Sequence, residues 1–143
     1  YILDVACGQA ISPYAIGIDN VHGIHPAYGG IYKPHIQANG EQLPIKDNSI
    51  SAIVSNHGIE HMDAKKAFHE WLRVLQPGGI IAFVTPDAKY GPIPDPDGHV
   101  KEWRPEEFFL DILLPLIEEE KIRVIEIDTF KNSFSWNLVV KKK

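Results

Sequence analysis

The sequence predicts a single α/β domain, residues 1–143, built on a mostly parallel sheet, and three patterns indicate this class. Short apolar segments of the kind found in strands buried on both faces recur along the chain. In the middle, a strand, an amphipathic helix and a second strand follow one another as in a right-handed crossover. At the C-terminal end, two strand-like segments are joined by a turn so short that they must pair antiparallel. We therefore expect a parallel sheet that ends in an antiparallel hairpin.

The first three strands are expected within the first 39 residues. Residues 1–6 are apolar except for Asp4, and residues 15–19 repeat this pattern more briefly, so both segments indicate buried strands. Residues 20–35 are rich in Gly, Pro, His and Tyr and have neither a helical nor a strand period, which predicts an ordered loop. A short third strand is expected over residues 36–39.

The central part of the chain predicts a strand, a helix and another strand. Residues 50–55 have the composition of a strand and follow a polar turn. A helix is expected to begin after Asp63, which suits an N-cap, and to end at residues 77–79, Pro-Gly-Gly. Residues 80–85 then indicate a buried strand. The helical spacing i, i+3, i+4, i+7, i+8, i+11 predicts a buried stripe of Ala64, Ala67, Phe68, Trp71, Leu72 and Leu75.

The last third predicts a long loop, a helix and the closing hairpin. Residues 86–103 are rich in Pro and Asp and indicate an irregular surface loop, where function often resides. Pro105 suits a first helical position, whereas Pro115 predicts a kink or a second short helix. The hairpin is expected from strands over residues 122–130 and 134–140, joined by a turn at Lys131, Asn132 and Ser133.

Composition narrows the partners and the compartment. The net charge is −5 and the one short cationic cluster is residues 141–143, so the basic surface of a nucleic-acid-binding protein is not expected. Cys7 is the only cysteine, which excludes an internal disulfide and a cysteine zinc site and fits a reducing compartment. No apolar run reaches membrane-spanning length and no signal peptide is recognised, so we expect a cytoplasmic protein without a membrane partner.

The first turn predicts a nucleoside ligand without phosphate groups. A dinucleotide site needs several glycines and a helix before its acidic residue, but this turn offers Gly8 alone, and Asp19 follows eleven positions later across Pro13. S-adenosylmethionine instead carries a sulfonium and an ammonium, which carboxylates such as Asp4 favour. The two carboxylate oxygens of Asp19 match two ribose hydroxyls.

Four blocks of the sequence resemble, in order, the class I S-adenosylmethionine-dependent methyltransferases, and more narrowly the methyltransferase type 11 group. They are "ILDVACGQA", "GIDN", "ANGEQLPIKDNSISAIVSNHGIEHM" and "EWLRVLQPGGIIAFVTPD". The resemblance implies a Rossmann-like doubly wound sheet with strand order 3-2-1-4-5-7-6 and strand 7 antiparallel. It also implies S-adenosylmethionine as the cofactor and methyl transfer to a small molecule, sugar or lipid head group as the activity.

The resemblance further implies which residues contact the cofactor. It places Asp19 on the ribose, and it places the Asn39 amide and the Gly40 backbone N–H on the adenine. The residues around the methionine moiety are Asp4, Ala6, Cys7 and Gly8, and those at the end of the fourth strand are Ser55 and Asn56.

Two departures from the family pattern leave an alternative function open. Ala6 and Ala10 replace glycines that usually let the backbone approach the ligand, and the first crossover is much shorter than the family norm. The alternative is a catalytically inactive nucleoside-binding or interaction module with the same fold. No helices precede the first strand in this sequence, which leaves an open pocket or one closed by a partner subunit, as in a homodimer.

Catalytic and acceptor-side residues are expected at the strand ends and in the long loop. His57 and His99 are the candidate general bases, because imidazole titrates near neutral pH. Asp87, Tyr90 and Trp103 are expected to line the acceptor side. Structural alternatives remain for one cofactor residue and one acceptor-side residue: Asp4 could bond backbone amides of its turn, and Trp103 could cap the following helix.

A competing motif predicts zinc. Residues 57–61, His-Gly-Ile-Glu-His, fit the H-x-x-E-H pattern of inverted zinc peptidases. Gly58 and the preceding strand indicate a strand-to-helix corner, however, and not the long helix that this motif requires. We therefore expect no metal, and we expect Glu60 and His61 to hold the corner through hydrogen bonds to loop backbone.

Overall fold

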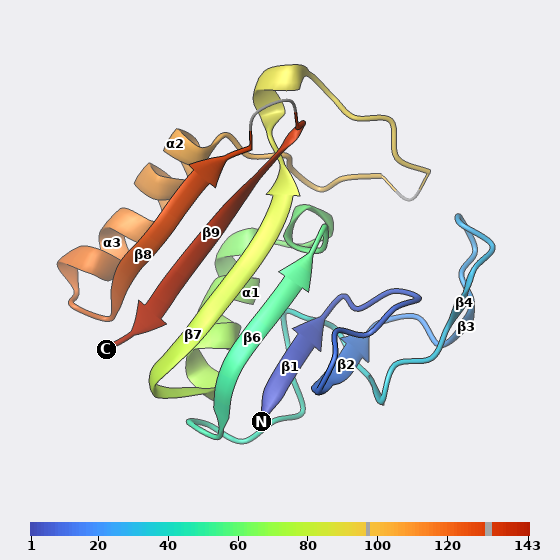
Figure 1. The fold of residues 1–143 in the computed structure, drawn as a ribbon, viewed down its shortest axis with the longest axis horizontal. Coiled ribbons are helices and arrows are strands. Elements are labelled where there is room, and N and C mark those ends of the chain that lie inside the picture. The colour runs from blue at the N-terminus through green and yellow to red at the C-terminus, as the bar shows by residue number, and fades with distance from the viewer. Residues whose placement is uncertain (97, 131–132) are drawn as a thin grey trace.

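The computed structural model describes residues 1–96, 98–130 and 133–143, and a seven-stranded sheet organises them (Figure 1). Its order is β5-β2-β1-β6-β7-β9-β8, and β9 alone runs antiparallel to its neighbours β7 and β8. The predicted order 3-2-1-4-5-7-6 with an antiparallel seventh strand is confirmed. The strands are β1 (Ile2–Val5), β2 (Ala15–Asp19), β5 (Ile36–Gln37), β6 (Ile50–Asn56), β7 (Leu75–Pro86), β8 (Ile122–Thr129) and β9 (Ser135–Lys142).

The connection between β2 and β5 differs from the prediction. The segment 20–35 contains a small antiparallel hairpin, β3 (Gly23–Ile24) with β4 (Ile31–Tyr32), so the expectation of a loop without strands is wrong there. Strands of two residues are too short to show a period, and the sequence could not reveal them. The turn predicted between β8 and β9 includes residues 131–132, which lie outside the described residues.

Helix α1 (Ala64–Val74) begins where the sequence predicts and ends sooner. The Asp63 side chain accepts a hydrogen bond from the Lys66 amide at 3.2 Å, as expected of an N-cap. The helix ends before the Pro-Gly-Gly segment, because Leu75 already pairs with Ile50 of β6 and opens β7. The next pair is Ala52 with Ile80, so β7 has more residues than β6 between the two pairs and is irregular at its start.

The second helical segment changes its geometry just before Pro115, where the sequence predicts a kink or a second short helix. It consists of α2 (Pro105–Phe108), a π-helical turn η3 (Phe109–Leu113) and α3 (Leu114–Glu118). The Leu114 N–H donates to the Phe109 carbonyl, five residues back, so the widened turn lies where the proline ring would otherwise clash with an α-helical carbonyl. None of the helices in the described part of the chain is long and apolar enough to cross a bilayer.

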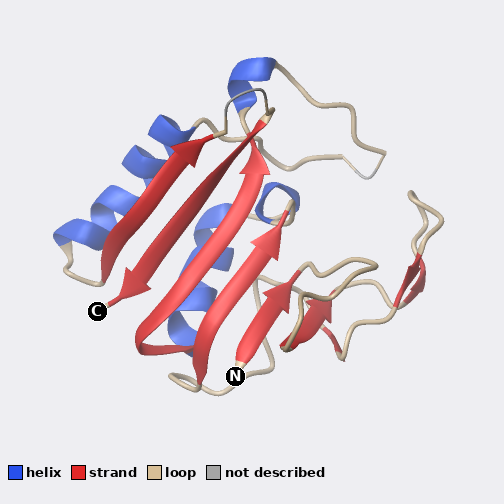
Figure 2. Cartoon of the chain, viewed as in Figure 1, coloured by secondary structure: helices blue, strands red, loops and turns tan. Residues whose placement is uncertain are grey.

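Both helical segments lie behind the sheet on the same face (Figures 1 and 2). An aromatic cluster joins them to the strands: the Phe108 ring contacts the rings of Phe68, Phe83, Trp103 and Trp136 at centroid distances of 5.3–5.9 Å. Phe68 belongs to α1, and Phe83 and Trp136 belong to β7 and β9. The main core is therefore the layer between these helices and the sheet.

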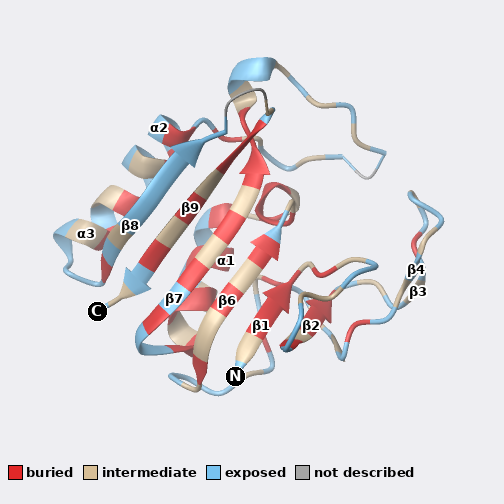
Figure 3. Ribbon diagram, in the orientation of Figure 1, coloured by how far each residue is buried: buried red, intermediate tan, exposed pale blue. Residues whose placement is uncertain are grey.

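The opposite face of the sheet carries no helix among the described residues. Only residues 6–14 connect β1 to β2, and this is shorter than the dozen or more residues that a helical crossover needs. Side chains on that face, such as Val54, Ala82 and Val139, are only partly buried, and β8 is exposed along most of its length (Figure 3).

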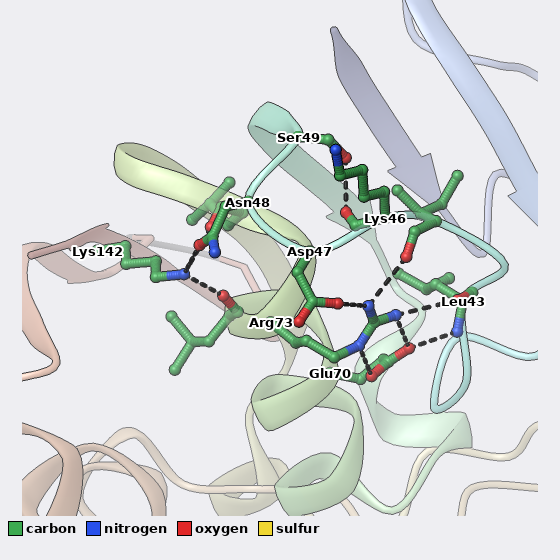
Figure 4. A network of polar contacts seen from close by, with 11 residues as sticks. Leu43, Lys46, Asp47, Asn48, Ser49, Glu70, Arg73 and Lys142 are labelled. Carbon is green, nitrogen blue, oxygen red and sulfur yellow. Dashed lines mark hydrogen bonds and ion pairs between the residues drawn. The ribbon is translucent and has the colours of Figure 1, made fainter.

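A polar network fastens the loop before β6 to helix α1 (Figure 4). The Arg73 guanidinium donates to both oxygens of Glu70 at 2.7 and 2.8 Å, to the carbonyls of Leu43 and Ile45, and to Asp47. The hydrogen bonds from Arg73 lower the pKa of Glu70. Because these bonds fix residues 43–47 on the helix, they also fix the path of the chain into β6.

The C-terminal strand is fastened to the same region (Figure 4). The Lys142 ammonium donates to the carbonyls of Leu72 and Leu75 and to the side chain of Asn48, at 2.7–2.8 Å. It thereby takes up carbonyl groups at the end of α1 that have no partner within the helix. Burial lowers the pKa of Lys142.

Replacing Phe108 with alanine should destabilise the fold strongly. Phe108 is fully buried, so Phe108→Ala should lower the free energy of unfolding by about 3–5 kcal/mol, as large core truncations do. Leu110, on the same segment but 58% exposed, provides the control. Leu110→Ala should change the free energy of unfolding by no more than about 0.5 kcal/mol. Urea denaturation measures both, and equal losses would contradict the assignment of the core.

Acid should remove the contribution of the Glu70–Arg73 pair. The pKa of Glu70 is lowered in the folded chain, so its stabilisation is fully present above its ordinary value and is lost as the pH falls through the lowered one. Glu70→Gln should therefore reduce the fall in urea midpoint between pH 6 and pH 3. The exposed Glu118→Gln is the control and should leave this pH dependence as in the unmodified chain.

Candidate functional site

A cavity of about 630 Å³ opens at the carboxyl ends of the parallel strands. Its volume lies within the range of about 300–1,000 Å³ that is usual for small-molecule sites, and its place is the one where open parallel sheets bind ligands. Nine of the residues predicted to form the site line it. These are Ala6, Cys7, Gly8, Asp19, Asn39, Gly40, Asn56, His57 and His99.

The lining of this cavity is acidic. It includes Asp19, Glu41, Glu60 and Asp95, and no lysine or arginine occurs among the described residues that line it. Carboxylates that face a cavity of limited solvent access attract cations and repel phosphates. The electrostatics therefore favour a positively charged ligand.

The turn after β1 is built around the Asp19 carboxylate. Oδ2 of Asp19 accepts a hydrogen bond from the Gly8 amide at 2.9 Å, and Oδ1 accepts one from the Val21 amide at 3.0 Å. Ala6 and Gly8 both have φ of +58°, a left-handed conformation that glycine adopts without strain and alanine does not. This explains why the family pattern has a glycine where this chain has Ala6.

Asp4 and Ser55 are brought close to the cavity but are not part of its lining. Oδ2 of Asp4 accepts a hydrogen bond from the Ser12 amide at 2.6 Å, so the contact that the structure shows is the structural alternative, a bond to the backbone of the first turn. Ser55 is buried at the end of β6. A Cβ at Gly58 would lie 2.6 Å from both Ser55 Oγ and Ala6 Cβ, so this glycine permits the turns after β1 and β6 to touch.

Asn39 and Gly40 form a rigid turn at the floor of the cavity. Oδ1 of Asn39 accepts a hydrogen bond from the Glu41 amide at 2.9 Å, and the Gly40 carbonyl accepts one from Trp71 Nε1 at 3.0 Å. A Cβ at Gly40 would lie 2.7 Å from Met62 Sδ. The segment that the resemblance assigns to adenine is thus fixed against helix α1.

His57 leaves the end of β6 with its ring toward the cavity. Its φ is +52°, and its amide donates to the Val84 carbonyl at 2.8 Å. Nε2 lies 3.2 Å from Ser135 Oγ, and Nδ1 lies 3.5 Å from Oε1 of the buried Glu60. The imidazole is therefore held between a hydroxyl and a carboxylate.

Glu60 and His61 form the corner at the 3₁₀ turn η1 (Ile59–His61). Oε2 of Glu60 accepts from Thr85 Oγ1 at 3.0 Å, and its carbonyl accepts from the amide of Val100 at 2.8 Å. Nδ1 of His61 lies 3.2 Å from the Gly98 carbonyl. His61 thus makes the expected bond to loop backbone, whereas the Glu60 side chain bonds a side chain of β7.

His99 lies on the loop after β7 and has a carboxylate near each ring nitrogen. Nδ1 lies 2.7 Å from Glu102 Oε1, and Nε2 lies 3.5 Å from Asp95 Oδ2. Its ring also meets that of His61 edge to face, with centroids 4.9 Å apart. A histidine held in this way is poorly placed to accept a proton from a substrate.

Asp87, Tyr90 and Trp103, which are expected on the acceptor side, are not part of the lining of this cavity. Asp87 is buried and pairs with Lys89 at 3.1 Å, at the start of the 3₁₀ turn η2 (Ala88–Tyr90). Tyr90 is 55% exposed. The Trp103 ring packs in the core against Phe108, because its backbone pairs with residue 87 and directs the side chain inward.

Sequence reasoning missed the residues that the β3–β4 hairpin and the long loop add to the lining. Tyr28 OH donates to Asp95 Oδ1 at 2.5 Å and so joins these two segments at the cavity. His25 is buried between the rings of Tyr28 and Tyr32. The available signal was the concentration of His and Tyr in residues 20–35, but nothing local showed which side chains turn inward.

A family model described as a methyltransferase domain matches residues 3–83, the segment that carries the turns after β1, β2, β5 and β6. The chain belongs to the methyltransferase domain family. The resemblance stated from the sequence is therefore confirmed. The methyltransferase match ends within β7, so the loop with His99 lies beyond it.

Among curated relatives, an uncharacterized protein of Methanocaldococcus jannaschii is 34% identical over 91 residues, 59% of this chain and 36% of the relative. A demethylmenaquinone methyltransferase of Corynebacterium urealyticum is 31% identical over 97 residues, 59% of this chain and 42% of the relative. The matches thus span about two fifths of the length of these relatives.

Solved structures share the methyltransferase fold over nearly the whole chain. A SAM-dependent methyltransferase from Methanosarcina mazei has a TM-score of 0.69 at 15% identity and covers 99% of this chain and 91% of its own. A methyltransferase from Haloferax volcanii, in complex with the Trm112 methyltransferase activator, has a TM-score of 0.66 at 12% identity, with coverages of 99% and 81%.

Cys7 of this methyltransferase domain should be unreactive toward thiol reagents. Burial, together with the charges of Asp19 and Asp4, raises its pKa to about 12 from an ordinary 9.0. At pH 8 this difference lowers the thiolate fraction by about a thousandfold. Alkylation by iodoacetamide should therefore be far slower for the folded chain than for the chain in guanidinium chloride, as followed by mass spectrometry. Similar rates in the two states would contradict the buried, acidic surroundings of the thiol.

Proposed function

We propose that this chain binds S-adenosylmethionine in the cavity at the strand ends and transfers its methyl group to a small-molecule nucleophile. The observation that carries this proposal is the acidic lining without lysine or arginine among its described residues, at the carboxyl edge of a methyltransferase-type sheet. A ligand with a sulfonium and an ammonium group matches these charges, whereas a phosphate-bearing dinucleotide does not. The family match supports the same cofactor.

The proposal assigns the polar groups of the cavity to parts of the cofactor. Asp19 would accept from the ribose hydroxyls, since each of its oxygens keeps a lone pair beyond the backbone bond that positions it. Asn39 and Gly40 would contact the adenine ring from a turn that α1 holds in place. Ala6, Cys7 and Gly8 would lie along the methionine moiety, with Asn56 at the end of β6. Asp4 would contribute by shaping this first turn.

The chemistry needs positioning more than acid–base groups. When bound, the cofactor supplies a methyl group already activated by its sulfonium. The task of the protein is to hold a nucleophile in line with it, and such orientation contributes about 7–11 kcal/mol in well-aligned systems. His57 is the proposed general base for a nucleophile that arrives protonated, because Glu60 lies behind its Nδ1 and its ring faces the cavity. The carboxylates around His99 fit a positioning role better.

A small organic acceptor is proposed for three reasons. The cavity is of small-molecule size. The net charge of −5 disfavours nucleic acid. The relative from C. urealyticum carries the name of an enzyme that methylates demethylmenaquinone. We further propose that residues 1–143 form one domain, which the seven-stranded sheet and the core cluster packed against it support.

Isothermal titration calorimetry tests the proposal. We expect S-adenosylmethionine to bind with one-to-one stoichiometry and ATP, which carries phosphates, to bind far more weakly. Asp19→Asn should weaken S-adenosylmethionine binding by about 10–100-fold, since it removes a charge and an acceptor worth roughly 1.5–3 kcal/mol. The asparagine oxygen can keep one of the two backbone bonds that Asp19 accepts, whereas Asp19→Ala would lose both.

Asp128→Asn is the matched control for this substitution. Asp128 is an exposed residue of β8, and its replacement should leave the affinity unchanged. Thermal denaturation of each variant shows whether the fold is retained. Absence of S-adenosylmethionine binding to the unmodified chain would sink the proposal and favour the inactive interaction module.

A further inference from the structure

Glu60, His61 and His99 bring three potential metal ligands together in the wall of the cavity. One ligand atom from each lies within 4.8 Å of the other two. Glu60 and His61 come from the turn η1, and His99 comes from the loop after β7. The cofactor assignment uses none of the three, and the bond of Glu60 to Thr85 engages only one of its two carboxylate oxygens.

The first indication of a cation is the state of the Glu60 carboxylate. Its side chain is fully buried, and Oε2 accepts from Thr85, but Oε1 is buried without a hydrogen-bond partner. The nearest recorded side-chain nitrogen, Nδ1 of His57, lies 3.5 Å from Oε1 and makes no hydrogen bond to it. An unsatisfied oxygen on a buried carboxylate is costly, and a bound cation would satisfy it.

The second indication is how the two imidazole rings are held. Nδ1 of His61 faces the Gly98 carbonyl, and Nδ1 of His99 faces the Glu102 carboxylate. Because both partners only accept hydrogen bonds, each Nδ1 must carry the proton. In a neutral ring the lone pair is then on Nε2. Histidines that bind metals show this arrangement, in which the other ring nitrogen donates to a carboxylate or a backbone carbonyl.

A third indication is the concentration of acceptors beside His99. Its Nε2 lies 3.5 Å from Asp95 Oδ2, so the nitrogen that would carry the lone pair faces a further carboxylate. Together with Glu102 on the other side of the ring, Asp95 adds negative charge beside the cluster. This charge favours the approach of a cation.

We propose that Glu60, His61 and His99 bind a divalent transition-metal ion of the zinc class. Two imidazoles and one carboxylate match the ligand sets of zinc sites that keep one coordination position open. Nitrogen ligands disfavour Mg²⁺ and Ca²⁺, which prefer all-oxygen sites. The open position faces the cavity, because all three residues line it. This set differs from the H-x-x-E-H reading of the sequence, which would pair His61 with His57.

Binding requires a modest contraction of the cluster. Ligand atoms in a tetrahedral zinc site lie roughly 3.3 Å apart, as metal–nitrogen distances of about 2.0–2.1 Å dictate. The separations here extend to 4.8 Å, so the ligands must approach by up to about 1.5 Å. His99 can supply this movement because it belongs to an irregular loop, whereas Glu60 is fixed by Thr85.

Cobalt and zinc titrations of the metal-depleted chain test the site. Co²⁺ should bind with one equivalent per chain and give the intense visible absorption of tetrahedral coordination, and Zn²⁺ should displace it. His99→Gln and His61→Gln should each weaken Zn²⁺ binding at least about 100-fold, more than the loss of an outer hydrogen-bond partner costs. His69→Gln, an exposed residue of α1, is the control and should bind as the unmodified chain does.

Each outcome of these titrations either supports or contradicts a metal site at Glu60, His61 and His99. Glu60→Gln could lose stability because the residue is fully buried, so the loop variant His99→Gln carries the test, with thermal denaturation confirming its fold. No stoichiometric Co²⁺ binding, or unchanged Zn²⁺ affinity in the His61→Gln/His99→Gln double variant, would overturn the proposal. S-adenosylmethionine affinity, measured on the metal-depleted chain, is a separate readout, so failure of the metal site is distinguishable from failure of the proposed function.

Discussion

The parallel pairing of β1 with β2 on one side and with β6 on the other is the constraint on which the rest of the structure depends. Parallel strands place all their carboxyl ends at one edge, so three turns that are distant in sequence meet there. Gly58 lets the turns after β1 and β6 touch, and the Asp19 carboxylate ties the end of β2 to the turn after β1. These contacts form the floor of the cavity, and loops form the walls around its opening.

The loops around this opening give the cavity its chemistry. The hairpin β3–β4 contributes Tyr28, and the loop after β7 contributes Asp95 and His99. The hairpin follows β2, which is separated from β7 in the sheet by β1 and β6. The acidic lining of the cavity suits a cationic ligand of the kind proposed for it. It equally suits a metal ion at the His61–His99 corner. One electrostatic feature thus supports two separate binding events, and the two proposals can be tested independently.

The layering of the domain follows from the lengths of its connections. Helices α1 and α2–α3 cover one face and meet through the Phe108 ring, whereas the segment between β1 and β2 is too short to add a helix on the other face. The strands nevertheless remain apolar on both sides, as Val54 and Val139 show. The side of the sheet that carries no helix among the described residues is therefore less buried than is usual for parallel sheets.

The sequence by itself determined the Asp63 cap and the closing hairpin, because period and capping are local signals. Its resemblance to a known family implied the strand order and nine residues of the cavity lining. Only the tertiary structure decided which polar side chains meet. It turned Asp4 toward the Ser12 amide, placed Trp103 in the core, and brought His99 beside His61 across 38 positions of sequence. The direction of a side chain in an irregular loop depends on packing against distant elements, and no local pattern records that packing.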